Sequence, residues 1–136
     1  MAYDTLKEKI RAEKTERVAR YDEFSDLYHN AYQAGLIAGR AENPSPMNVI
    51  NPSNGQQWHV PEGACGFAWV KIRPATSSFA RYLLKQKLAR TSYSGGLEIW
   101  IGEHGQSVDR KLAHAQKMAD IFKANGIQAH AFSRLD

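Results

Sequence analysis

Six positively charged residues in one short stretch of this chain are the residues best suited to binding a charged partner. Acidic residues are absent between Glu62 and Glu98. The cations of that interval are Lys71, Arg73, Arg81, Lys85, Lys87 and Arg90. Unneutralised Lys and Arg side chains attract anionic partners, including the phosphates of nucleic acids. The alternative is a solvated helix face whose charges only keep the protein in solution.

Aromatic residues alternate with other types in the same region. Residues 67–72 read FAWVKI, and this alternation predicts a strand with Phe67 and Trp69 on one face. The strand predicted at 97–101 adds Trp100 to that face, and the strand predicted at 127–133 adds Phe132, with Arg134 following it. Aromatic rings flanked by cations on a four-stranded sheet are the surface on which RNA-recognition modules stack bases. The predicted site residues are therefore the six cations together with Phe67, Trp69, Trp100 and Phe132.

The residues that could support catalysis are scattered along the sequence. Cys65 is the single cysteine, and no base or orienting carboxylate lies near it in the sequence. The five histidines include no pair at metal-ligand spacing. We therefore expect no metal, no cofactor and no enzymatic activity. A folded pocket that united His104, Arg110 and a carboxylate would change this expectation.

The loop 102–107 (GEHGQS) precedes a predicted helix and has two interpretations. Backbone N–H groups at a helix start can bind phosphate, and the glycines would permit close approach. However, the loop lacks the glycine and lysine spacing of a Walker A or dinucleotide-binding motif. A turn followed by an N-cap at Ser107 explains the pattern more simply.

The composition limits the remaining classes of protein. The chain has 136 residues, of which 43% are hydrophobic and 24% charged, as expected for one folded domain. No apolar run approaches the ~18 residues that span a bilayer, and the N-terminus lacks the apolar core of a secretory signal. We therefore expect no membrane association and a reducing compartment. The net charge of +4 is uneven, because residues 1–42 carry −1 and residues 43–136 carry +5.

The elements that must position these residues fall into three parts. Residues 1–42 form a helical arm, in which residues 3–42 are predicted to be one long helix because Pro is absent and good helix formers dominate. Residues 43–64 are a Pro-rich connector, with a possible hairpin of strands 47–50 and 57–60. Residues 65–136 predict the order β-α-β-β-α-β. In this order a helix capped by Ser77 or Ser78 runs to about Leu88, and the strand that follows it covers residues 90–93. The expected fold is α+β, a ferredoxin-like sandwich preceded by the long N-terminal helix.

The aromatic face of the predicted sheet has two possible environments. The N-terminal helix carries aromatic residues at helical spacing, and we expect it to lie across this face, supplied by the same chain or by a second copy. The helix residues that would bury the rings are Phe24, Leu27, Tyr28 and Tyr32. In the alternative the face is open and forms a binding platform.

The chain also resembles a known family over residues 63–136. The runs CGFAWVKIRPATSSFARYLLKQKLARTSYSGGLEIWI and GQSVDRKLAHAQKMADIFKANGIQAHAFSRLD are similar to a family of small uncharacterised proteins of tailed bacteriophages. The resemblance implies a phage setting, either as an accessory of host takeover or DNA metabolism, as a virion component, or as an inhibitor of host defence. It implies no catalytic residue. The corresponding location is the host cytoplasm, or the virion for a structural component.

Two functions follow from these observations. The leading hypothesis is a small basic accessory protein that binds DNA or RNA without catalysis. The alternative is a protein-interaction role with a phage or host protein, as a virion or assembly subunit or a defence inhibitor, through homo-oligomerisation of residues 3–42.

Overall fold

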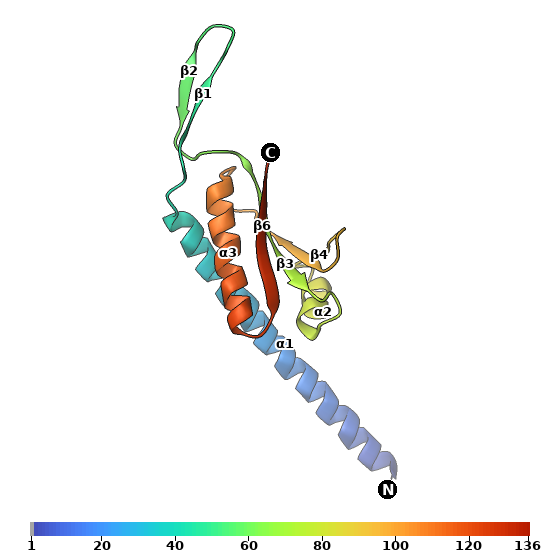
Figure 1. Ribbon diagram of the computed structural model, residues 1–136. Coiled ribbons are helices and arrows are strands. Elements are labelled where there is room, and N and C mark those ends of the chain that lie inside the picture. Colours follow the sequence, from blue (N-terminus) through green and yellow to red (C-terminus); the bar gives the residue numbers. More distant parts are fainter. Residues whose placement is uncertain (1) are drawn as a thin grey trace.

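The structure is a computed structural model that describes residues 2–136, with side chains from Asp4 onward. It is an α+β fold with three helices and two antiparallel sheets of two and four strands (Figure 1). The elements in chain order are α1 (Ala2–Ala41), β1 (Met47–Ile50), β2 (Gln57–Val60), β3 (Gly66–Arg73), α2 (Ser78–Lys85), β4 (Arg90–Thr91), β5 (Leu97–Trp100), α3 (Val108–Ala124) and β6 (Gln128–Leu135). The predictions of the α+β class, of the long first helix and of the hairpin at 47–60 are confirmed.

Two elements are shorter than the sequence predicts. Helix α2, predicted to reach about Leu88, ends at Lys85, because Lys87 adopts a left-handed φ of 59° and Leu88 N–H turns back to the Leu83 carbonyl at 2.9 Å. The strand predicted at 90–93 pairs only over Arg90–Thr91. Ser92 N–H then bonds the Gly96 carbonyl at 2.9 Å, which closes the turn to β5.

The larger sheet has the order β4-β5-β3-β6, and every neighbouring pair is antiparallel. Strand β3 is central: Val70 faces Ile99 of β5 on one side and Ala131 of β6 on the other. Alternate residues of these strands point toward α2 and α3 and are almost completely buried. This set comprises Ala68, Val70, Ile72, Leu97, Ile99 and Ala129, and it meets Phe79, Leu83, Met118 and Phe122 of the two helices.

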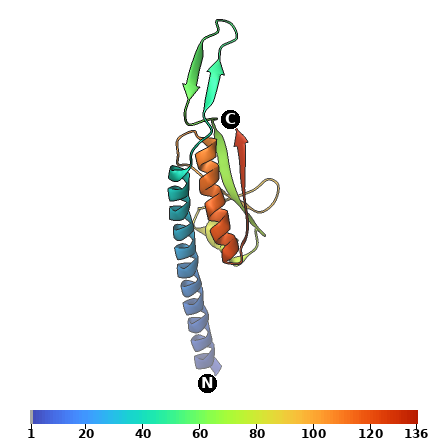
Figure 2. The ribbon, with the colours of Figure 1, turned by 60° about the vertical axis from the view of Figure 1, so that its left-hand side comes forward.

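Helix α1 forms a third layer on the outer side of α2 and α3 (Figures 1 and 2). Its rings contact the helices edge to face: Tyr21 lies 5.5 Å from Tyr82, and Phe24 lies 5.4 Å from Phe79, between ring centroids. The expectation that this helix of the same chain covers the aromatic face of the sheet is therefore wrong. The aromatic stripe of α1 instead packs on aromatic side chains that α2 leaves on its outer surface.

Two parts of the chain extend beyond this three-layered body. Residues 4–20 of α1 are exposed along their whole length, and the β1–β2 hairpin projects at the opposite end of the molecule (Figure 2). The hairpin carries Trp58, which is 48% exposed. Within the described residues, no helix is both long enough and apolar enough to cross a membrane.

Candidate nucleic-acid interface

The sheet face away from the helices carries a continuous row of aromatic rings. Trp69 of β3 stands opposite Trp100 of β5 and opposite Phe132 of β6 in the strand register. The Trp69 and Trp100 rings are 4.9 Å apart at an angle of 17°, and the Trp69 and Phe132 rings are 6.1 Å apart at 19°. Because β5 and β6 flank β3 on opposite sides, Trp69 lies between two nearly parallel neighbours. Phe67 meets Trp100 edge to face at 5.9 Å.

Two arginines extend this row. The Arg90 guanidinium lies 4.3 Å from the centroid of Trp100, and that of Arg134 lies 5.3 Å from Phe67 and 5.8 Å from Trp100. Such contacts hold an arginine over a ring while leaving its N–H donors available to solvent or ligand. The site thus combines aromatic surface and positive charge.

Glu98 is the acidic residue that orders one side of the site. It accepts hydrogen bonds from Trp100 Nε1 and Ser92 Oγ, both at 3.0 Å, and pairs with Arg90 Nε at 3.5 Å. Burial by itself would raise the pKa of Glu98, but the bonds from Trp100 and Ser92 and the nearby Arg90 outweigh burial and lower it. Glu98 therefore stays ionised and fixes the Trp100 indole and the Arg90 side chain.

The face is hollowed beside the rings. A depression of about 390 Å³ is lined by Trp69, Arg90, Tyr93, Trp100 and Arg134, among others. A smaller one of about 260 Å³ lies between Lys87, Arg90 and Trp100. Phe132 at the end of the row is 44% exposed. Planar ligands can therefore reach the edges of the Trp69 and Trp100 rings from the depressions. They can also reach the outer side of the Phe132 ring directly from solvent.

The structure brings only some of the predicted cations to this face. Arg90 lies in it, Lys87 borders it, and Arg73 is exposed at the end of β3. Lys71 is different, since it is 6% exposed and its Nζ donates to Ser94 Oγ of the β4–β5 turn. The turn therefore covers the Lys71 ammonium, and phosphate contact by this residue stays a prediction.

Arg81 and Lys85 belong to another surface. Both are exposed on α2, which lies on the opposite side of the sheet from the rings. Lys85 Nζ lies 5.2 Å from the Tyr21 ring of α1 and borders a small hollow together with Lys14 and Arg17. The acid-free interval of the sequence is thus divided between two faces of the molecule.

Two residues of the site are missing from the predicted set. Strand alternation puts Arg134 on the aromatic face, but the predicted phosphate ligands include only the cations of the acid-free interval. Tyr93 reads as a turn residue in the sequence, although it is fully exposed and lines the larger depression. Strand alternation is thus sufficient to predict that Arg134 belongs to the site. The position of Tyr93 could not be predicted in this way, because it depends on how the turn folds over Lys71.

Searches with the chain found no matching protein-family model, no matching curated protein and no matching solved structure. The functional conclusion therefore rests on the site itself.

Proposed function

We propose that this protein binds single-stranded nucleic acid on the open aromatic face of its four-stranded sheet. The supporting observation is the uncovered row of Phe132, Trp69 and Trp100, with Arg90 and Arg134 set over its rings. Unpaired bases offer planar surfaces to such rings, and each base stacked on an aromatic side chain contributes roughly 1–3 kcal/mol. In a duplex the bases are already stacked on each other, so single strands are the better ligand.

The structure favours a division of roles within the site. Bases would insert at the depression beside Trp69 and Trp100 and stack on the outer side of Phe132. Arg73, Arg90 and Arg134 would contact phosphates, with Lys87 at the border. Arg81, Lys85 and the covered Lys71 are left out of this interface.

We also infer that residues 65–136 have the ferredoxin-like arrangement. The strand order β4-β5-β3-β6, antiparallel throughout and with helices between β3 and β4 and between β5 and β6, supports this inference. The biological setting that we propose is a phage-type accessory protein in the host cytoplasm. It rests on the resemblance of residues 63–136 to bacteriophage proteins.

Tryptophan fluorescence provides a direct test. Two of the three tryptophans lie in the proposed interface, and the third, Trp58, lies in the hairpin, so Trp58→Phe removes the background signal. A single-stranded oligonucleotide of about 12 nucleotides should quench this variant, with an affinity that falls as salt rises. Absence of salt-sensitive binding at micromolar protein would overturn the proposal.

A matched pair of double variants locates the interface. Arg90→Gln with Arg134→Gln should weaken binding and reduce the slope of log K against log salt by about 0.7 for each phosphate of the single strand that is no longer neutralised. Arg81→Gln with Lys85→Gln removes the same charge from α2 and should leave the affinity nearly unchanged. Equal weakening in the two double variants would mean that only net charge matters, and the assigned face would be wrong.

A protein-interaction role is the second candidate, and the projecting half of α1 favours it. Leu6, Ile10 and Val18 in this segment are each 55% exposed. These exposed side chains could pack against another helix, here from a second copy of the chain or from a phage or host protein. Light scattering separates the candidates, because a monomer at all accessible concentrations would contradict helix-mediated oligomerisation.

A further inference from the structure

A second candidate site lies at the opposite end of α1 from its projecting half. A cavity of about 760 Å³ opens between the C-terminus of α1, the segment before β3 and the β5–α3 loop. Its lining includes Arg40, Glu62, Cys65, Glu103, His104 and Arg110. A volume of this size is typical of small-molecule sites. It lies outside the aromatic face, so the inference is independent of nucleic-acid binding.

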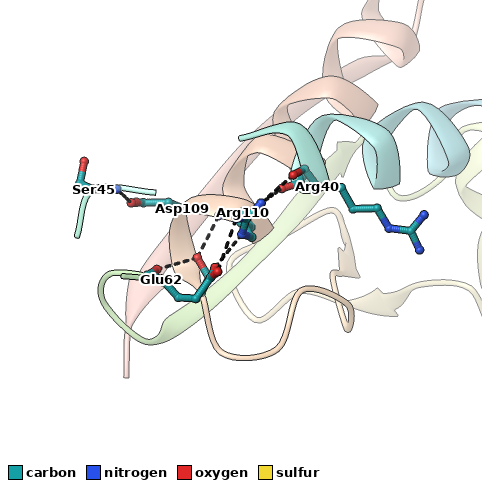
Figure 3. A network of polar contacts seen from close by, with 7 residues as sticks. Arg40, Ser45, Glu62, Asp109 and Arg110 are labelled. Carbon is teal, nitrogen blue, oxygen red and sulfur yellow. Dashed lines mark hydrogen bonds and ion pairs between the residues drawn. The ribbon is translucent and has the colours of Figure 1, made fainter. Parts of the chain in front are cut away.

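Arg110 holds the walls of this cavity together. Its Nη1 donates to the carbonyls of Gly39 at 3.1 Å and Arg40 at 2.7 Å, and its Nε pairs with Glu62 Oε2 at 2.6 Å (Figure 3). The preceding residue on the helix, Asp109, accepts from Ser45 N–H at 2.8 Å. The first turn of α3 thereby fixes both the end of α1 and the connector. Because Glu62 neutralises Arg110, this pair supports the wall and contributes little free charge.

Glu103 supplies an acceptor that the described part of the chain does not satisfy. Its Oε1 accepts from the Tyr32 hydroxyl of α1, whereas its Oε2 is buried and has no hydrogen-bond partner among the described residues. A buried carboxylate oxygen without a donor is costly, and native proteins normally satisfy such groups. Because Glu103 lines the cavity, a ligand that brings an N–H or O–H donor and displaces the atoms covering this oxygen would satisfy it.

His104 stands beside Glu103 without neutralising it. Its Nε2 lies 2.9 Å from Nδ1 of the buried His114, so the two imidazoles share one hydrogen bond. Burial, and secondarily the cations Arg110, Arg40 and Lys111, lower the pKa of His104 despite the opposing effect of Glu103. His104 is thus neutral at pH 7 and can exchange hydrogen bonds with a ligand through its remaining ring nitrogen.

Arg40 supplies the opposite charge. Its backbone carbonyl belongs to the Arg110 contacts, but its side chain extends away from them and forms no ion pair with a described residue (Figure 3). After the Glu62–Arg110 pair is set aside, the lining offers one unmatched acceptor on Glu103 and one unmatched cation on Arg40.

We propose that this cavity binds a dipolar small molecule, with a hydrogen-bond donor or ammonium group on Glu103 and a carboxylate or phosphate on Arg40. Amino acids and dipeptides have this chemistry, as do nucleoside monophosphates, whose base N–H groups and phosphate lie at opposite ends. Molecules with only one of the two ends satisfy half of the site and bind weakly.

Cys65 makes the proposal testable on the full-length protein. It is the single cysteine, it is exposed, and it lines the cavity, so a bound ligand should protect its thiol from a maleimide or disulfide reagent. The probes are amino acids, dipeptides and nucleoside monophosphates up to about 10 mM, each beside single-ended controls: acetate, inorganic phosphate, simple amines and nucleosides. We expect saturable protection by at least one dipolar class and little by the controls, and the protecting class identifies the source of the ligand.

Two variants and one control decide the outcome. Arg40→Gln and Glu103→Gln should each weaken protection about tenfold, as expected for removal of a charge-assisted hydrogen bond. Lys85→Gln on α2 should leave protection unchanged. Arg40 is exposed, so its substitution is compatible with folding even if Glu103→Gln is not. Failure of every dipolar probe, equal protection by single-ended controls, or unchanged protection in Arg40→Gln would overturn the proposal.

Discussion

His114 is completely buried between α1 and α3, where its ring contacts Tyr32 at 4.9 Å and shares a hydrogen bond with His104. Burial, with a smaller contribution from His104, lowers the pKa of His114 to about 4. As the pH falls, the unfolded chain takes up this proton near pH 6.5, whereas the native protein takes it up only at a much lower pH. The neutral imidazole therefore contributes stability above pH 6.5, and this stability is lost as the pH falls from about 6.5 to about 4.

We expect the free energy of unfolding to decrease in this interval by up to about 1.4 kcal/mol per pH unit for the His114 proton. Urea titrations at pH 7.5, 6.5, 5.5 and 4.5 measure this slope. His114→Asn should flatten it, whereas His130→Gln, at an exposed strand position, should preserve it. A slope that persists in the His114 variant would assign the effect to other groups.

The glycines of α1 explain how these histidines fit against the helix. A Cβ at Gly35 would overlap the His114 ring and lie 2.9 Å from its carbonyl oxygen, and a Cβ at Gly39 would overlap the His104 ring. Alanine is normally the better helix residue by about 1 kcal/mol, so the close approach of α3 must outweigh propensity here.

Gly35→Ala should accordingly destabilise the protein by about 1–3 kcal/mol, as overpacking does in a tight interface. Chemical denaturation measures the change. Gly102→Ala is the matched control, because nothing lies within 4 Å of a Cβ at that position. A stabilised Gly35 variant would show that α1 can move away from α3 at little cost.

At the scale of elements, two serines begin the helices beneath the sheet but have different surroundings. Ser77 Oγ accepts from Ala80 N–H at 3.2 Å at the start of α2. Ser107 Oγ accepts from Arg110 N–H at 3.3 Å and also donates to the Glu62 carbonyl at 2.9 Å. The second cap thus joins α3 to the connector as well as starting its own helix.

Ser77→Ala should cost about 1 kcal/mol, the usual value for removal of an N-cap. Ser107→Ala should cost more, about 2 kcal/mol, because the hydrogen bond to the Glu62 carbonyl disappears together with the cap. Thermal and urea unfolding of both variants compare them directly. Equal costs would mean that the connector contact adds nothing to stability.

At the scale of the whole molecule, α1 has one half that packs and one half that extends. The rings of Tyr21, Phe24 and Tyr28 contact α2 or neighbouring side chains, whereas residues 4–20 are exposed. The exposed half therefore contributes little to the stability of the monomer.

Removal of residues 1–17 should therefore shift the unfolding midpoint by less than about 3 °C, as surface changes do. In contrast, Phe24→Ala removes ring contacts with Phe79 and Tyr82 and should cost about 2–4 kcal/mol. Scanning calorimetry at two protein concentrations provides the measurement. A large, concentration-dependent decrease on truncation would instead support association through this helix.

The sequence by itself determined the order of the elements and the two faces of the sheet. Strand alternation placed Trp69, Trp100 and Phe132 together, and the serine caps placed the helix starts, because these signals depend on neighbours only a few residues apart. The length of α2 was less predictable, since its end depends on Lys87 adopting a left-handed conformation that a glycine would normally signal.

Only the tertiary structure decided which of these surfaces remain open. It placed α1 on α2 and α3 instead of on the aromatic row, covered Lys71 with the β4–β5 turn, and separated Arg81 and Lys85 from the rings. It also brought His104, Glu103 and Arg110 to one cavity, although the sequence showed no pattern linking them to Cys65 or Arg40. Tertiary packing depends on how well whole surfaces fit together, as Gly35 fits against His114. Residues that are far apart in the chain leave no local sequence pattern from which this fit can be predicted.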